Sequence, residues 1–162
     1  MKYRSLGKAN FDAIVTGELT HYATWLEGEL DEIIMGYFVN PGRTTEFQTL
    51  FLHREGLTFQ HKIDIVRAMI PLFGKEAEVV RLKSLLDQVQ DFKSWRNAMA
   101  HGKDASDRRW SKRIKISTVS RSGKERIIEI TPASHAKTLS EAEKLLISLQ
   151  DAKKHLLESL RP

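Results

Sequence analysis

The stretch RLKSLLDQVQDFKSWRNAMAHG, residues 81–102, decides the fold of this chain. Its apolar residues recur at steps of three and four, the period of one face of an α-helix. Gly102, the last residue of the stretch, is a typical helix stop. We therefore predict a long amphipathic helix over about residues 76–100, with an apolar stripe made by Leu82, Leu85, Val89, Phe92 and Met99.

The same period predicts further helices on both sides of this stretch. One covers residues 11–37, with Asn10 as its N-cap, and another follows the N-cap residue Thr58. A short helical piece is expected around residues 47–52. The Thr-x-x-Glu pattern at residues 138–141 predicts a capping box at the start of a terminal helix.

From residue 112 the apolar period changes from about 3.6 to 2, the period of a strand. Ile114 and Ile116 lie on one arm, Ile128 and Ile130 lie on the other, and Ser122-Gly123 separates the arms. This pattern predicts a β-hairpin over about residues 112–131. The fold class is therefore mainly α: an antiparallel bundle of four to five helices, residues 1–162 as a single domain, with a β-hairpin inserted before the C-terminal helix.

The amino-acid composition excludes several classes of function. Hydrophobic residues make up 41% and charged residues 29%, the balance of a folded soluble protein. The chain has no cysteine, which excludes disulfides, a thiolate nucleophile and cysteine-bound zinc. The histidines lack metal-site spacings such as HxxxH, so we expect no metal and no cofactor. No apolar run approaches the roughly 20 residues that span a bilayer, and we expect a cytoplasmic protein with no membrane partner.

A basic segment follows the long helix. Between residues 103 and 126 nine basic residues stand against three acidic ones. Such a segment attracts the phosphates of a nucleic acid, and Trp110 or Trp95 could stack on a base. The alternative is a solvated hairpin surface. The candidate RNA-binding residues are Lys103, Arg108, Arg109, Trp110, Lys112, Arg113, Lys115 and Arg126.

One charged residue interrupts the apolar stripe of residues 81–102. The same steps of three and four residues place Arg96 in the apolar stripe, between Phe92 and Met99. A buried guanidinium without partners costs several kcal/mol. Arg96 should therefore pair with an acid such as Asp31 or Glu32, lie at the mouth of a cleft, or face another subunit.

His101 follows at the end of the same helix, where the negative end of the helix dipole favours a protonated imidazole. It is also a common helix cap. Asn97 precedes it by one helical turn, so its amide can reach the ring. Arg96 and His101 stand about 140° apart around an ideal helix. Either the helix unwinds after residue 99, or a second copy of the chain completes a site that contains both.

The segment Arg96-Asn97-Ala98-Met99-Ala100-His101-Gly102 resembles the signature of the HEPN superfamily (higher eukaryotes and prokaryotes nucleotide-binding domain). That signature has an arginine, usually a polar residue next to it, and a histidine a few residues later. Only these seven residues carry the motif. The resemblance in organisation covers about residues 11–160.

The resemblance implies a metal-independent endoribonuclease that acts as a homodimer, with one composite cleft built from both motifs. Arg96 would bind the scissile phosphate, and His101 would act as general base or acid for attack by the RNA 2′-hydroxyl. Asn97 would orient His101 or the phosphate. The products would carry a 2′,3′-cyclic phosphate and a 5′-hydroxyl. Many members serve in toxin–antitoxin, antiphage or RNA-processing systems, so a cognate antitoxin protein is a further possible partner.

Three alternatives remain open at the level of sequence. The chain can be a non-catalytic HEPN-like module that binds RNA, a nucleotide or a protein. It can be a structural helical adaptor in which Arg96 forms an internal ion pair. A helix-turn-helix DNA-binding protein is less well supported, because the basic residues fall on the expected hairpin and its approach.

Overall fold

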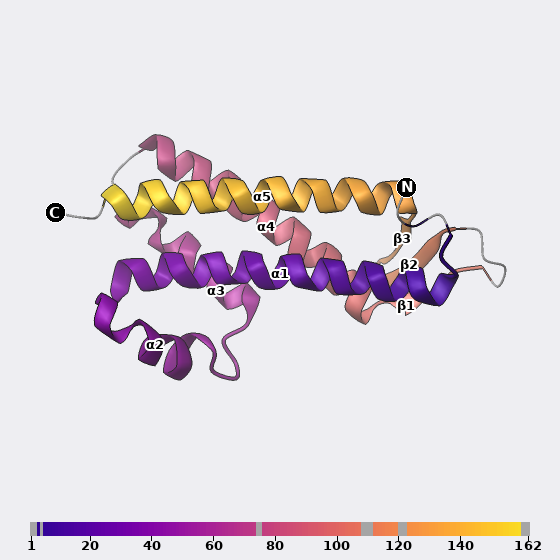
Figure 1. Ribbon diagram of the computed structural model, residues 1–162, viewed down its shortest axis with the longest axis horizontal. Coiled ribbons are helices and arrows are strands. Elements are labelled where there is room, and N and C mark those ends of the chain that lie inside the picture. The colour runs from indigo at the N-terminus through magenta and orange to yellow at the C-terminus, as the bar shows by residue number, and fades with distance from the viewer. Residues whose placement is uncertain (1–2, 4, 74–75, 108–111, 120–122, 160–162) are drawn as a thin grey trace. The chain divides into compact units, whose positions relative to one another are not determined.

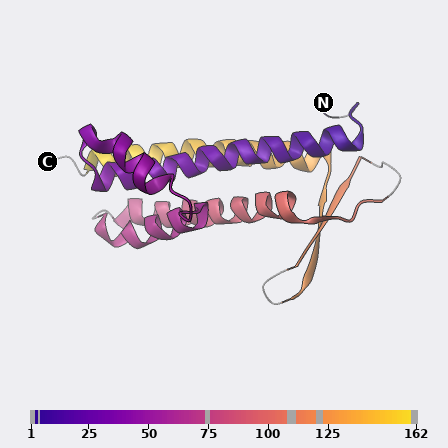
Figure 2. The same cartoon turned by 90° about the horizontal axis from the view of Figure 1, so that it is seen from below.

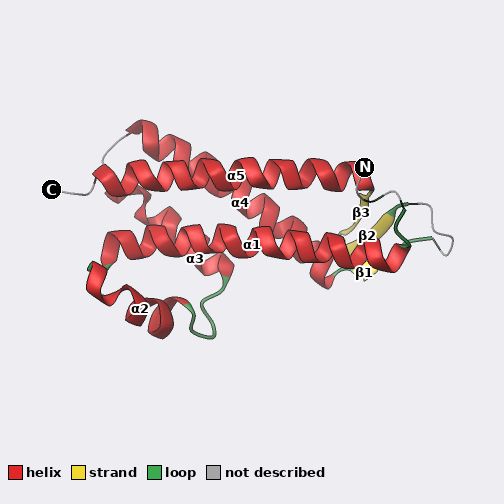
Figure 3. Ribbon diagram, viewed as in Figure 1, coloured by secondary structure: helices red, strands yellow, loops and turns green. Residues whose placement is uncertain are grey.

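The structure, a computed structural model, is mainly helical with one small sheet (Figures 1 and 3). It describes all residues except 1–2, 4, 74–75, 108–111, 120–122 and 160–162. The elements are α1 (Lys8–Phe38), α2 (Thr44–Phe47), α3 (Phe59–Met69), α4 (Glu76–His101), β1 (Lys103–Asp104), β2 (Ile114–Val119), β3 (Glu125–Ile130) and α5 (Pro132–Ser159). This confirms the predicted helical fold with a hairpin inserted before the C-terminal helix.

The chain forms two compact units. The first consists of Met1–Ala23 and Phe92–Glu143, and the second of Thr24–Asp91 and Lys144–Pro162. Helices α1, α4 and α5 each contribute one segment to each unit. Neither unit is therefore a continuous stretch of sequence.

The helix starts differ from the predictions at two places. Helix α1 begins at Lys8, so Asn10 lies inside it and is not its N-cap. Helix α5 begins at Pro132, six residues before the expected capping box at residues 138–141. Its cap is Thr131: Thr131 Oγ1 accepts from the Ser134 backbone N at 3.1 Å, and Ser134 Oγ accepts from the Thr131 N at 2.9 Å. Proline at the first helical position also favours this start.

The N-cap of α3 is confirmed. Thr58 Oγ1 accepts from the backbone N of His61, and the backbone N of Thr58 donates to His61 Nδ1. The short piece expected around residues 47–52 is a π-helical turn, Gln48–Leu52, which directly continues α2. A 3-10 turn, Pro41–Arg43, leads into α2 from the end of α1.

The first unit is built around the end of α4 and the sheet. The strand order is β1-β2-β3, all antiparallel, with Ile114 opposite Ile130 and Ile116 opposite Ile128, as the period-2 pattern predicts. Figure 2 shows β2 and β3 as a ribbon that leads away from the C-terminal end of α4. The buried core of this unit includes Phe11, Val15, Leu19, Phe92, Met99 and the four isoleucines.

The second unit packs the later part of α1 against α3, α4 and α5. Its fully buried side chains include Leu26, Leu30, Ile33, Ile63, Leu82 and Leu86, each worth roughly 1.5–3 kcal/mol of burial. Charged pairs on α1 and α5 border this core: Lys153 Nζ lies 2.6 Å from Glu29 Oε2 and also contacts Glu32. These contacts fix α5 beside α1 in this unit (Figure 1).

Candidate functional site at the end of helix α4

Arg96 is half-buried, between the buried side chains of Phe92 and Met99 along α4. Its Nη1 donates to Asn97 Oδ1 at 3.0 Å. Its Nε is buried and has no hydrogen-bond partner. Among the described residues of its unit, no carboxylate lies within ion-pair distance of the guanidinium. The charge of Arg96 is therefore not neutralised by a carboxylate among the described residues of its own unit.

The acids that could have paired with Arg96 are engaged elsewhere. Asp31 lies 2.9 Å from Lys62 Nζ, and Glu32 contacts Lys153, all within the second unit. An internal ion pair with either acid was the main structural explanation for Arg96. Both acids instead have lysine partners within their own unit, and the pairing of Arg96 with either of them stays a prediction.

His101 is exposed and is the last residue of α4. The helix does not unwind before it, because the backbone N of Gly102 still donates to Ala98 O at 2.8 Å. Regular helix geometry therefore separates the Arg96 and His101 side chains by about 140° around the axis and roughly 7.5 Å along it. The expected unwinding of the helix after residue 99 is therefore not present, and α4 itself does not bring the two side chains together.

Asn97 bonds to Arg96 and not to His101. Its Oδ1 accepts from the guanidinium, which holds one edge of the Arg96 fork in place. No hydrogen bond joins Asn97 to the His101 ring in the described part of the chain. In this arrangement the amide orients the arginine, and the expected orientation of His101 by Asn97 is not present.

Gly102 brings the sheet against the end of α4. A Cβ at this position would overlap the Ile116 side chain and the Ala98 carbonyl oxygen, and would lie 3.1 Å from a Thr118 methyl group. Only glycine permits this approach. Arg126 lies opposite Thr118 on the same sheet face as Ile116. The sheet therefore presents Arg126 on the face that packs beside His101.

The candidate RNA-binding cations divide into paired and unpaired groups. Arg113 Nη1 lies 3.4 Å from Glu129, and Lys115 Nζ lies 3.0 Å from Asp107. Lys103, Lys112 and Arg126 are exposed and have no carboxylate partner among the described residues. Arg108, Arg109 and Trp110 lie outside the described residues, and Trp95 is half-buried on α4.

An exposed ion pair attaches β1 to the start of α1. Lys8 Nζ donates to Asp104 Oδ2 at 2.7 Å, and the backbone N of Ser106 donates to Asp104 Oδ1 at 2.9 Å. These hydrogen bonds hold the pKa of Asp104 well below its usual range. Asp104 therefore remains an anion next to the basic segment, and it reduces the positive charge at that point.

Sequence reasoning missed a buried polar group in the first unit. His135 is fully buried, and its Nε2 lies 2.7 Å from Glu18 Oε2. Tyr3 OH donates to the same oxygen at 2.9 Å, and its ring packs edge-on against the imidazole. Burial and the Glu18 carboxylate raise the pKa of Tyr3 to about 12. No periodicity singles out these residues, because they lie far apart in sequence.

Sequence reasoning also missed a buried cation in the second unit. Lys62 is buried and contacts Glu27 Oε1 at 2.8 Å and Asp31 Oδ2 at 2.9 Å. Burial alone would lower its pKa, but these two hydrogen bonds outweigh burial and raise the pKa of Lys62. Lys62 occupies an apolar register between Phe59 and Val66, just as Arg96 does on α4. A sequence signal for this cation was therefore present.

The remaining searches of the chain gave negative results. In the described residues, no helix is both long and apolar enough to cross a membrane, and no cluster of three or more potential ligands is arranged to hold a metal ion. Comparison with protein-family models, curated proteins and solved structures found no match.

Proposed function

We propose that this chain is a metal-independent endoribonuclease of HEPN type, with a composite site formed by two copies of α4. The observation that carries the proposal is the unneutralised charge of Arg96. A half-buried guanidinium with a buried, unsatisfied Nε lowers the stability of the fold. Such a group is expected where the protein binds an anion, and a phosphodiester is an anion that this planar fork fits well.

The chemistry follows from the roles of the two side chains. Arg96 binds the scissile phosphate and stabilises the charge that develops on it in the transition state. His101, exposed at the helix end, takes the proton from the 2′-hydroxyl or gives one to the leaving 5′-oxygen. The 2′-oxygen then attacks phosphorus, which gives a 2′,3′-cyclic phosphate and a 5′-hydroxyl. This reaction needs no metal ion from the protein.

Asn97 acts as a positioning residue for Arg96. Its amide oxygen holds Nη1, so the remaining N–H groups of the guanidinium are free for phosphate oxygens. The sheet holds RNA near the site with its unpaired cations, above all Arg126, while Arg113 and Lys115 must first release their carboxylates. We therefore assign a larger share of RNA affinity to Arg126 than to Arg113.

The test is cleavage of labelled structured RNA in EDTA, with end-group analysis of the products. Arg96→Ala and His101→Ala should each lower cleavage by roughly 100-fold or more while the circular dichroism spectrum is unchanged. Asn97→Ala should lower cleavage less than either. Full activity of either variant removes that residue from the mechanism. RNA binding without cleavage by the native chain would favour the non-catalytic HEPN-like module.

A mixing experiment tests the composite site. Arg96→Ala and His101→Ala chains are each inactive alone, but a mixed pair retains one Arg96 and one His101. Equilibration of the two variants should therefore recover part of the native activity. No recovery, with subunit exchange verified by a mass tag, contradicts a site shared between two copies.

A further inference from the structure

The second unit carries an exposed aromatic surface that the proposed function does not use. We call it the α2 patch, and it consists of Phe38, Phe47, Leu50 and Phe51. Phe38 is 57% exposed, Leu50 is 71% exposed and Phe51 is 49% exposed. The rings of Phe47 and Phe51 lie 5.0 Å apart. So many large apolar side chains gathered on one surface mark an interaction site.

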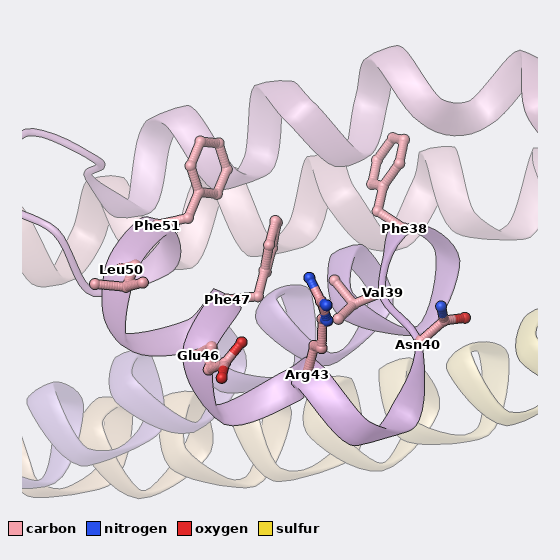
Figure 4. Close-up of a pocket in the computed structure, with 8 residues that line it drawn as sticks. All are labelled: Phe38, Val39, Asn40, Arg43, Glu46, Phe47, Leu50 and Phe51. Atoms are coloured by element: carbon pink, nitrogen blue, oxygen red, sulfur yellow. The ribbon is translucent and has the colours of Figure 1, made fainter.

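The patch surrounds a hollow of about 520 Å³ in which Arg43 and Glu46 also take part (Figure 4). The π-helical turn Gln48–Leu52 follows α2 directly and carries Leu50 and Phe51 on the rim of the hollow. Such turns are frequent at functional sites. Arg43 and Glu46 are both exposed, and neither has an ion-pair partner among the described residues.

We propose that the α2 patch binds the α2 patch of a second copy of this chain across a two-fold axis. In such an interface every contact between two different residues occurs twice, so the patch must be complementary to itself. The patch meets this condition in charge: Arg43 of one copy can pair with Glu46 of the other, and the reverse pair forms at the same time. A partner of a different chemistry would not need one cation and one anion at neighbouring positions.

The order of side chains along the hollow also suits a two-fold contact. Figure 4 shows Leu50 and Phe51 at one end, Phe38 at the other, and Arg43, Glu46 and Phe47 between them. An axis through the middle places the Leu50 end of one copy on the Phe38 end of the other. Arg43 and Glu46 then lie near the axis, where Arg43 of one copy is close to Glu46 of the other.

The contact has the size of a weak dimer interface. Three phenylalanines and one leucine from each copy are only partly exposed, so with their polar rim they bury on the order of 1,000 Å² in total, below the roughly 1,200–2,000 Å² of stable interfaces. This interface belongs to the second unit and does not depend on the ribonuclease assignment. Arg96→Ala and His101→Ala should therefore leave it intact.

The first test measures the native mass of the full chain by light scattering. Leu50→Asp should halve the mass of the native assembly, because it places a carboxylate in the apolar hollow of the second copy. Val80→Asp is the matched control, since Val80 is 63% exposed on α4 away from the patch. A monomeric native chain, or a Leu50→Asp chain with the native mass, overturns the proposal.

A charge exchange makes the test specific for self-association. Arg43→Glu alone and Glu46→Arg alone should each weaken association roughly tenfold to a hundredfold, because each brings like charges together at two places. An equimolar mixture of the two variants should associate again, since each mixed pair restores two opposite-charge contacts. A mixture that stays dissociated overturns the two-fold arrangement. Normal folding of both variants is verified by circular dichroism.

Discussion

Replacement of Arg96 by methionine tests whether this arginine has a functional role or a structural one. Methionine has a similar length and suits a position between Phe92 and Met99. The change removes a buried Nε that lacks a partner, which should recover about 1–3 kcal/mol. It also removes one hydrogen bond to Asn97, worth about 1–2 kcal/mol. We expect a free energy of unfolding between about 1 kcal/mol lower and about 2 kcal/mol higher, together with complete loss of RNA cleavage.

Lys62→Met provides the contrast within the same chain. Lys62 is also a cation in an apolar register, but its removal leaves the buried Asp31 carboxylate without its nearest partner. Breaking a buried pair in this way costs about 3–5 kcal/mol. For a chain of this size each kcal/mol shifts Tm by about 2–4 °C, so Tm should fall by roughly 10 °C.

Urea and thermal denaturation, followed by circular dichroism, measure both variants against the native chain. A loss of more than about 2 kcal/mol for Arg96→Met would refute the argument, because it would mean that the guanidinium stabilises the fold. Retained cleavage in that variant would refute the catalytic role. A small effect of Lys62→Met would show that burial and pairing do not predict the behaviour of these cations.

Three further predictions concern the first unit. Gly102→Val should displace β2 from the end of α4, lower stability by about 1–3 kcal/mol and reduce cleavage, as measured by denaturation and RNA assay. Thr131→Ala should lower stability by about 0.5–2 kcal/mol, through loss of the α5 N-cap. Tyr3 has its pKa raised to about 12, so it favours folding below pH 10, and this contribution of about 2–3 kcal/mol is lost as pH rises from 10 to 12. The pKa of Tyr22 is also raised, by burial and by Glu143, so the titration of tyrosinate absorbance is read as a difference: Tyr3→Phe should remove the group that titrates near pH 12. A native titration without that group contradicts the assignment.

The sequence predicts the helices and the hairpin well because each has a strong apolar period. The stripe on α4 and the alternating isoleucines are read directly from residue spacing, and the structure buries both. The start of α5 was missed because Thr131 caps through Ser134 in a pattern other than Thr-x-x-Glu. Several side-chain patterns can cap a helix, so the start of a helix is harder to predict from sequence than its apolar period.

The sequence identifies cations at unusual, apolar positions but does not show what role each of them has. Arg96 and Lys62 both interrupt an apolar stripe. Lys62 contacts two carboxylates from α1, whereas Arg96, among the described residues of its unit, bonds to the neighbouring amide of Asn97 and to no carboxylate. The difference depends on tertiary neighbours more than 30 positions away, which no local pattern contains. The carboxylate partners of Arg113 and Lys115 are nearer in sequence, 16 and 8 positions away, but the net charge of the segment does not show which of its cations they neutralise.

The close approach at Gly102 constrains how related chains can diverge. Any side chain at position 102 requires smaller groups at positions 116 and 118 and a shift of the α4 backbone away from the Ala98 carbonyl oxygen. These three positions should therefore change together during evolution. A lineage that loses the glycine must also change the residues of β2 that cover it. His101, at the preceding position, would then lie beside a differently packed sheet.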